Sequence, residues 1–378
     1  MKPQANNSYS VIIVGAGPAG TTLGYELARQ GIDVLILEKA KLPRYKTCAG
    51  GITTKTYNLL GINIDSLLCN KIYGARITYK FGNEFVKRYH EPLTYMVMRD
   101  EFDYLLTQQA QEAGAVVIDT QRVSSIEILF DHARVTTDTD IYKGKILVGA
   151  DGANSVVAKK LDLTKGLEFL VGMEAKVTVS NNTMNQWDSY IGMDLGCIRK
   201  GYSWVFPKKE HLSIGIVGPL AQTKRMKAIC QNYIDSLNLG SYQINNFRGH
   251  FLPTRRDTSP IQRERSLLLG DAAGLVDPLS GEGIYYAIKS AQLAAPVIAQ
   301  NLRNNTTDLQ KYQQMVNSEI SPELKVAHTL WKLFSWFPRP CFSCLRRSDR
   351  LWESSCRLVR GEKSYVSIKN KLGLFKFT

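Results

Sequence analysis

The sequence predicts a mixed α/β (α+β) fold, in which a parallel-sheet domain is interrupted by an antiparallel sheet and followed by helices. Two glycine-rich turns, at 14–20 and 269–278, each follow a short apolar run, as strand-to-helix turns of parallel sheets do. Between them, residues 166–218 alternate apolar and polar side chains, which is typical of antiparallel strands. The last 70 or so residues are helical in character.

We therefore expect three regions. A discontinuous Rossmann-like domain covers residues 1–165 and 261–300, with a β-rich excursion near 70–100. Residues 166–260 form an inserted antiparallel-sheet domain, and residues 301–378 form a basic, helical C-terminal region. The length of 378 residues, with 44% hydrophobic and 22% charged residues, suits a globular protein with sizeable cores.

The first turn has the form G-x-G-x-x-G, with the apolar strand 11–14 before it and a helical pattern at 21–30 after it. Its residues are Gly15, Gly17, Pro18, Ala19 and Gly20. In such a turn the first glycine permits a tight bend, the second lets the backbone approach a pyrophosphate, and the third allows close helix–strand packing. The helix N-terminus attracts phosphate, so this turn predicts a dinucleotide site.

A second apolar run, 34–37, ends at Glu38 and Lys39. A carboxylate at Glu38 can accept the hydrogen bonds of a ribose diol. These features place Glu38 and Lys39 in the cofactor site, but they do not distinguish NAD from FAD.

Further motifs resemble those of the FAD-dependent aromatic hydroxylases, and they occur in that family's order. They contain Arg99, Asp151, Gly270 and Asp271. The resemblance implies that FAD is the cofactor and that Asp271 binds its ribitol. It also implies that the turn from Pro278 to Ile284 faces the flavin, with Pro278 beside the isoalloxazine and the N–H groups of Gly281 to Gly283 directed at O2. Taken singly, Asp151 could belong to a plain turn and Arg99 to a helix surface.

In the antiparallel region, the alternation places Tyr202, Trp204 and Phe206 on one face of a strand, where they could simply form core. Two segments here resemble the geranylgeranyl reductase family. Tyr202 to Pro207 matches its Tyr-x-Trp-x-Phe-Pro motif, and Gly215 follows at the family's distance, although the next glycine is Gly218 and not residue 217.

The second segment is Lys46 to Gly51, which is similar to the family's Pro-Cys-x-Gly-Gly loop with Thr47 in place of the proline. The resemblance implies that Cys48, Ala49 and Gly50 lie near the isoalloxazine. It also implies that a geranylgeranyl-type chain lies against a group of four residues. These are Gly51, Tyr202, Trp204 and Phe206.

The expected function is an FAD-dependent reductase that saturates C=C bonds of a polyprenyl chain by hydride transfer plus protonation. Cys48 is the candidate catalytic residue, as proton donor directly or through water; alternatively it is a small loop cysteine without a chemical role. The electron donor is NADPH or a ferredoxin-like protein. An FAD monooxygenase shares every flavin motif, a halogenase would carry a Trp-x-Trp-x-Ile-Pro segment that is absent, and a non-enzymatic carrier is a further alternative.

The net charge of +14 is concentrated near the C-terminus, where residues 339–378 carry ten Lys and Arg against three acids. The aromatic stretch 330–342 precedes this excess, which suits peripheral contact with a membrane surface; alternatively these rings pack on the protein. No base-reading module is visible, so we expect no nucleic-acid partner.

Seven irregularly spaced cysteines favour a reducing compartment, so a cytoplasmic location is expected. Cys341 and Cys344 form the one close pair, and without further ligands nearby we expect no metal there. No run of eighteen apolar residues predicts a transmembrane helix, and the polar start of the sequence does not resemble a signal peptide.

Overall fold

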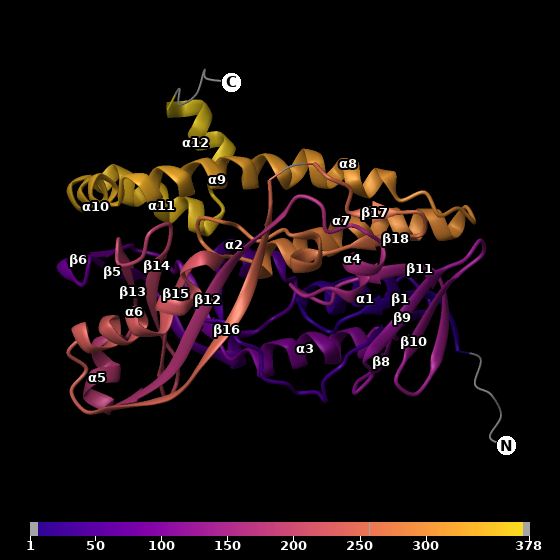
Figure 1. Ribbon diagram of the computed structural model, residues 1–378, viewed down its shortest axis with the longest axis horizontal. Coiled ribbons are helices and arrows are strands. Elements are labelled where there is room, and N and C mark those ends of the chain that lie inside the picture. Colours follow the sequence, from indigo (N-terminus) through magenta and orange to yellow (C-terminus); the bar gives the residue numbers. More distant parts are fainter. Residues whose placement is uncertain (1–6, 257, 373–378) are drawn as a thin grey trace.

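The fold was analysed in a computed structural model, which describes residues 7–256 and 258–372. Figure 1 shows two large sheets side by side, with a layer of C-terminal helices along one long edge of the molecule. The predicted fold class is confirmed, since a parallel sheet, a separate antiparallel sheet and C-terminal helices are all present.

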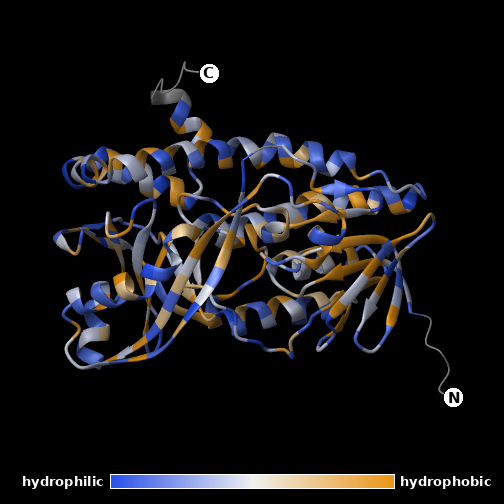
Figure 2. Cartoon of the chain, in the orientation of Figure 1, coloured by the Kyte–Doolittle hydropathy of each residue, from blue (hydrophilic) through white to orange (hydrophobic). Residues whose placement is uncertain are grey.

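The first sheet has eight strands and holds the parallel core. Along its main path the order is β17 (Gln262–Arg263), β18 (Ser266–Leu268), β11 (Ile141–Gly149), β1 (Ser8–Val14), β2 (Val34–Leu37) and β8 (Val116–Ile118). The hairpin β9 (Val123–Ile128) and β10 (Ala133–Thr137) pairs with β11. The apolar run in β1 is buried, as a strand covered on both faces should be, and Figure 2 shows hydrophobic residues concentrated in these strands.

Several helices pack against this sheet. They include α1 (Pro18–Ala28), α3 (Arg99–Glu112), α4 (Val156–Lys160) and α7 (Ile284–Arg303). Gly20 lets α1 sit directly on the turn before it, because a Cβ at that position would lie 1.9 Å from the carbonyl oxygen of Gly15. The third glycine of the motif therefore has the packing role that the sequence predicts.

The second sheet has seven strands. Their order is β16 (Tyr242–Arg255), β12 (Leu167–Val179), β15 (Leu212–Pro219), β14 (Tyr202–Pro207), β13 (Tyr190–Leu195), β5 (Gly74–Tyr79) and β6 (Gly82–Arg88). All neighbouring pairs are antiparallel except β13 with β5. The β-rich excursion thus adds two strands to the sheet formed mainly by residues 167–255. Helices α5 (Asn181–Gln186) and α6 (Thr223–Ser236) belong to the same region.

A third, small sheet joins the two large parts. It consists of β3 (Gly51–Thr53), β7 (Thr94–Val97) and β4 (Leu68–Ile72), and α2 (Thr54–Leu59) follows β3 directly. The remaining short elements are the 3₁₀ turns η1 (Asp65–Leu67), η2 (Leu220–Gln222) and η3 (Gly270–Ala273).

Five helices form the C-terminal layer. They are α8 (Gln310–Glu319), α9 (Ser321–Trp336), α10 (Pro338–Arg347), α11 (Asp349–Arg360) and α12 (Tyr365–Leu372). Phe342 of α10 is buried against Phe85 and Tyr79 of the second sheet. Among the residues that the structure describes, no helix is long and apolar enough to cross a membrane.

Candidate functional site

The glycine-rich turn between β1 and α1 forms an open cradle. Gly15 has a φ of +105°, and a Cβ there would lie 2.4 Å from the carbonyl oxygen of Ala150, so glycine is required. Gly17 is different, because the nearest atom to an added Cβ is the Arg44 guanidinium at 3.8 Å. Pro18 and Ala19 begin α1, and within the described chain no side chain caps that helix end. A pyrophosphate fits this arrangement of unshielded backbone and helix N-terminus.

Glu38 lies at the end of β2 beside this cradle, as predicted, and is 4% exposed. Its carboxylate accepts hydrogen bonds from the N–H of Ala16 and of Ala40, each at 3.0 Å. Arg44 approaches the same carboxylate at 3.3 Å. Lys39 is exposed, in contrast, and no described contact turns it toward the cradle.

Arg44 also links the cradle to Arg99, since both guanidinium groups bind the buried carboxylate of Asp103 at 2.8–3.1 Å. Burial opposes the charge of Arg99, but Asp103 and then the thiol of Cys48 outweigh it and raise the pKa of Arg99 above its ordinary value. Arg99 is therefore a fixed cation beside the Cys48 loop.

The segment from Arg44 to Gly51 lies across one face of the second sheet, where Glu174 holds it. Glu174 is 6% exposed and accepts hydrogen bonds from the Cys48 N–H at 3.0 Å, the Tyr45 hydroxyl at 3.1 Å and the Ser213 hydroxyl at 3.0 Å. Burial and then the charge of Glu174 raise the pKa of Tyr45 to about 12. A buried carboxylate thus fixes the backbone at the candidate catalytic cysteine.

Lys208 holds the other side of the same loop. It follows the Tyr-x-Trp-x-Phe-Pro strand, is 4% exposed, and donates to the carbonyl oxygens of Gly50 at 3.2 Å and Val97 at 2.8 Å. Burial lowers its pKa to about 8. Lys208 therefore joins three segments that the sequence places far apart: the cysteine loop, the end of β7 before Arg99, and β14.

Lys46 connects the loop to Asp271. Its ammonium lies 2.6 Å from Nε2 of His250, and that nitrogen is 3.9 Å from the Asp271 carboxylate. Burial, and then the positive charge of Arg99, lower the pKa of Lys46 to about 8. Asp271, predicted to bind ribitol, is thus brought next to the cysteine loop, 223 residues away in the sequence.

The three aromatic rings of β14 lie in a row on the face that carries the loop. Ring centroids of Tyr202 and Trp204, and of Trp204 and Phe206, are each 6.4 Å apart. Trp204 and Phe206 form a cluster with Ala49, Leu252 and other apolar side chains, and Phe206 lies 3.1 Å from the Cβ position of Gly51. The single face that the alternation predicts is confirmed.

Gly215 explains why the motif pairs this tryptophan with a glycine. In the strand pairing, Gly215 lies between Trp204 and Glu174. A Cβ on Gly215 would lie 2.1 Å from the indole ring. The Trp204 ring is 8% exposed, and its N–H has no hydrogen-bond partner among the described residues. The tryptophan therefore lies flat on the sheet with an unsatisfied donor.

The turn after η3 meets the aromatic row. The Tyr202 hydroxyl donates to the carbonyl oxygen of Ser280 at 2.6 Å. Asp277 is fully buried and accepts from the N–H groups of Leu279 and Ser280, which shapes the turn. Burial raises the pKa of Asp277.

Not every backbone donor of this turn is available in the way the sequence predicts. The N–H of Gly281 already donates to the Asp277 carbonyl oxygen at 2.9 Å. Gly283, by contrast, stands at the start of α7, where no described side chain caps the helix. Pro278 is buried beside these residues, and Ile284 is the first residue of α7.

Asp151 has a local role in the structure. Its carboxylate accepts from the Ser155 hydroxyl and the Val156 N–H, both at 2.6 Å, and so caps α4. Burial nevertheless raises its pKa. The neighbouring backbone supports the cofactor turn directly, because Gly15 packs on Ala150.

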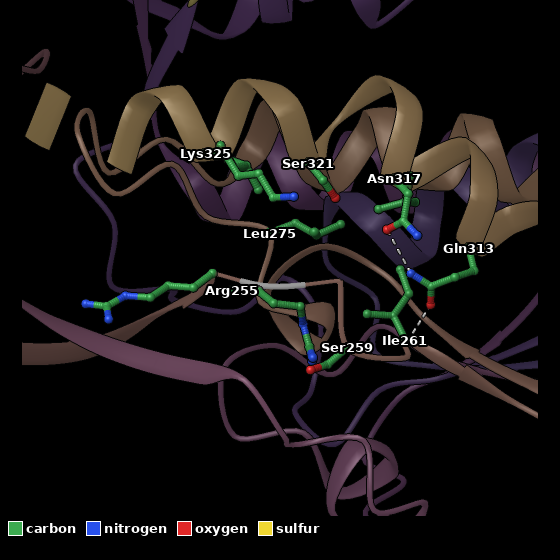
Figure 3. A pocket seen from close by; sticks show the side chains of 11 residues that line it. Arg255, Ser259, Ile261, Leu275, Gln313, Asn317, Ser321 and Lys325 are labelled. Carbon is green, nitrogen blue, oxygen red and sulfur yellow. Dashed lines mark hydrogen bonds between the residues drawn. The ribbon is translucent and has the colours of Figure 1, made fainter. Parts of the chain in front are cut away.

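A small cavity lies behind η3, between Arg255, Leu275 and the helices α8 and α9 (Figure 3). Its volume of about 10 Å³ suits one water molecule. Arg255 donates there to the carbonyl oxygens of Ala273, Lys165 and Leu163, so it braces the chain around Asp271.

The FAD-binding domain family matches residues 8–317, which include the cradle, Arg99, the aromatic row and the turn after η3. The chain belongs to the FAD-binding domain family. FAD is accordingly its cofactor, and the unshielded Gly17 backbone and uncapped start of α1 fit the dinucleotide. The protein is an FAD-dependent oxidoreductase.

Relatives with named activities support the resemblance to geranylgeranyl reductases. An uncharacterised protein of Methanosarcina barkeri is 32% identical over 86% of this chain and 84% of its own length. The chloroplastic geranylgeranyl diphosphate reductase of Arabidopsis thaliana is 27% identical over 87% and 75%. A digeranylgeranylglycerophospholipid reductase of Methanopyrus kandleri is 28% identical over 94% and 93%.

Solved structures confirm the fold. A geranylgeranyl bacteriochlorophyll reductase-like protein from Thermoplasma acidophilum has a TM-score of 0.76 at 22% identity, covering 87% of this chain and 88% of its own. A flavin-dependent brominase has a TM-score of 0.77 at 20% identity, covering 97% and 98%. One architecture thus carries both kinds of chemistry, and the fold alone does not choose between them.

Sequence reasoning missed Arg44, Lys46, Glu174, Lys208 and His250. Glu174 lies in an alternating strand on the side that reads as polar and solvent-facing. It is buried because the Cys48 loop covers that side, which periodicity cannot reveal. One feature of the sequence could have indicated Lys208 as a site residue. It directly follows a strand motif whose last residues enter the site.

Proposed function

We propose that this protein is a prenyl reductase, which saturates C=C bonds of a geranylgeranyl-type chain at its FAD site. The observation that supports this best is the position of the Cys48 loop on the aromatic row of β14. Ala49 and Gly51 approach Trp204 and Phe206, so an apolar wall adjoins the segment that is expected beside the flavin. The named activities of the distant relatives are consistent with it.

The residues proposed to hold FAD fall into three groups. The phosphate cradle has Gly15, Gly17, Pro18, Ala19 and Gly20, with Glu38 at the ribose and the exposed Lys39 next to it in the sequence. The loop and the segment before α3 supply Cys48, Ala49, Gly50 and Arg99. The third group comes from the segments that follow β11 and β18. Its members are Asp151, Gly270, Asp271, Pro278, Gly281, Gly283 and Ile284.

Bound in its reduced form, FAD would supply the hydride, which carries the two electrons that saturate the double bond. The second carbon of that bond takes a proton, and the Cys48 thiol is the proposed donor, directly or through water. Glu174 and Lys208 hold its loop in place. Tyr202, Trp204 and Phe206 exclude water and stabilise positive charge on the chain. NADPH or a ferredoxin-like protein restores the two electrons.

An anaerobic reaction tests this proposal. The purified protein is reduced with dithionite and mixed with geranylgeranyl diphosphate, and flavin oxidation is followed together with the mass of the lipid. We expect flavin oxidation with a product about two mass units heavier for each bond reduced. A flavin that stays reduced until oxygen enters would contradict the proposal and favour a monooxygenase.

Cys48→Ala tests the proton donor. We expect the variant to retain FAD and to transfer hydride about 100-fold more slowly, because a positioned acid typically contributes 10²–10⁴-fold. Cys344→Ala is the control, since Cys344 is exposed on α10. An unchanged single-turnover rate in Cys48→Ala would remove the thiol from the mechanism.

A further inference from the structure

The C-terminal layer presents an exposed aromatic patch at the junction of α9 and α10. Trp336 is 64% exposed, Phe337 50% and Leu333 39%. Large apolar side chains rarely gather on a surface without a partner. We define this group, with the exposed cations Lys332 and Arg339, as the α9–α10 patch.

The helical spacing explains why these side chains point outward together. Leu324 and Ala327 are buried on the inner side of α9. Lys325, Lys332 and Leu333 are exposed on the other side, and Trp336 and Phe337 continue that side to the end of the helix. The patch is therefore formed by the outer face of α9 and continues across Phe337 into the start of α10.

Along the sequence, the patch lies in a segment with one sign of charge, between Glu323 and Asp349. From Leu324 to Ser348 the sequence has five Lys and Arg and no Asp or Glu. Lys200, from the loop before β14, lies over the ring of Trp331 at 5.9 Å and adds to this positive surface. Aromatic rings set among cations match the interface of an anionic bilayer, where rings sit at headgroup level and cations meet lipid phosphates.

The inner side of the same helix reaches the aromatic row. Trp331 packs into the cluster that contains Trp204, Phe206, Leu252 and Ala49, next to Cys48. Helix α9 thus carries Lys332, Leu333 and Trp336 of the patch on its outer side and a member of the apolar cluster, Trp331, on its inner side.

We propose that the α9–α10 patch docks this protein on the surface of an anionic lipid bilayer, with Trp331 at the point where a membrane lipid chain enters the aromatic cluster. The docking is independent of the reaction, whereas the entry point rests on the proposed function. Figure 1 shows α8, α9 and α10 along one edge of the molecule, on the side away from the two sheets, with α12 projecting from the same edge.

Vesicle binding of the FAD-loaded protein, without substrate or reductant, tests the docking. We expect cosedimentation with vesicles containing about 30% phosphatidylserine and at least tenfold weaker binding to pure phosphatidylcholine vesicles. Lys332→Glu with Arg339→Glu should reduce binding to the anionic vesicles about 30-fold or more. Trp336→Ser with Phe337→Ser should reduce it about tenfold or more.

Matched controls lie on other surfaces. Lys224→Glu with Arg225→Glu changes two exposed cations of α6, and Phe130→Ser changes a ring that is 99% exposed between β9 and β10. Both should bind vesicles as the unaltered protein does. Equal binding to both vesicle types, or equal losses in patch and control variants, would overturn the proposal. The proposal would also be overturned if the unaltered protein forms a dimer that binds no vesicles and that Trp336→Ser dissociates.

The entry point has its own test, in which the two proposals can fail separately. In single-turnover reduction, the Trp336→Ser/Phe337→Ser variant should act on detergent-dispersed geranylgeranyl diphosphate at the normal rate. It should act at least tenfold more slowly on a geranylgeranyl lipid embedded in anionic vesicles. A slow rate in both assays contradicts the entry point, while absence of turnover in the unaltered protein contradicts the proposed function and leaves the vesicle result standing.

Discussion

At the scale of single residues, the site depends on charged groups buried under the Cys48 loop. Lys208 places an ammonium among backbone carbonyl groups, with two hydrogen bonds and 4% exposure. Burying a cation is costly unless it is paired, and its lowered pKa expresses that cost. In return for this cost, one side chain holds two separate segments of the candidate site in fixed positions, because Lys208 binds the carbonyl groups of both Gly50 and Val97.

The lowered pKa of Lys208 predicts a pH dependence of stability. In the folded chain Lys208 loses its proton near pH 8, whereas in the unfolded chain it keeps the proton up to about pH 10.5. Between these values the unfolded state binds more protons, so the free energy of unfolding should rise with pH, by about 3 kcal/mol at most. Below pH 8 this group adds no slope.

Urea unfolding from pH 7 to 10 of the unaltered protein and of Lys208→Met measures this contribution. The difference between their unfolding free energies should change across that range, since the variant lacks the titrating group. Lys209→Met provides the control, because Lys209 is the exposed neighbour. A pH-independent difference between the protein and Lys208→Met would show that Lys208 does not titrate there.

At the scale of elements, three adjacent strands build the wall of the site. Glu174 of β12, Gly215 of β15 and Trp204 of β14 lie side by side in the strand pairing. The glycine leaves room above its own strand for the indole ring of Trp204, beside the strand that carries the Glu174 carboxylate. The pattern of small and large side chains across the strands therefore sets the shape of the face on which the Cys48 loop rests.

Gly215→Ala should disturb this wall. The new Cβ would lie 2.1 Å from the Trp204 ring and 2.6 Å from the Met173 carbonyl oxygen, so the ring must move. We expect a loss of about 1–3 kcal/mol in the free energy of unfolding. Gly249→Ala in β16 is the control, since the nearest described atom to its Cβ would be the Gly172 carbonyl oxygen, at 3.8 Å.

A double-mutant cycle tests whether the clash with Trp204 causes the loss of stability in Gly215→Ala. In a Trp204→Ala background, Gly215→Ala should cost at least 1 kcal/mol less than in the unaltered protein, because the ring that it strikes is gone. Equal costs in the two backgrounds would assign the effect to the strand backbone.

Much of this architecture could be predicted from local patterns. The turn at Gly15 to Gly20, the aromatic face of β14 and the start of α7 each follow from short stretches of sequence. Contacts between residues far apart in the sequence could not be predicted in this way. Glu174 reads as a solvent-facing residue, and only the path of the Cys48 loop over its strand makes it buried. Likewise, β5 and β6 join the second sheet through parallel pairing with β13, which no local pattern encodes.

At the scale of the whole molecule, the C-terminal layer is tied to the turn that is expected to face the flavin. The hydroxyl of Tyr365, at the start of α12, donates to the fully buried Asp277 carboxylate at 2.7 Å. Glu323 of α9 accepts from the Tyr365 N–H at 2.7 Å, which fixes the start of α12. The same turn is held from the opposite side, where Lys55 binds Glu282 at 2.6 Å. Helix α12 therefore contacts α9 and this turn, 42 and 88 residues earlier in the sequence, and helps to fix the turn.

Tyr365→Phe should loosen this link and weaken FAD binding. Asp277 would keep its two backbone donors but lose its phenol partner, and a buried acceptor that loses a partner costs about 1–3 kcal/mol. We expect the apoprotein to lose stability in that range and the FAD dissociation constant, measured by flavin fluorescence, to rise about three- to tenfold. Tyr242→Phe serves as the control, because it removes another phenol hydrogen bond to a carboxylate, that of Asp235 in α6, away from the residues proposed to hold FAD. It should lower stability and leave FAD affinity unchanged. Equal FAD affinities in the unaltered protein and Tyr365→Phe would mean that α12 stabilises the fold without acting on the flavin turn.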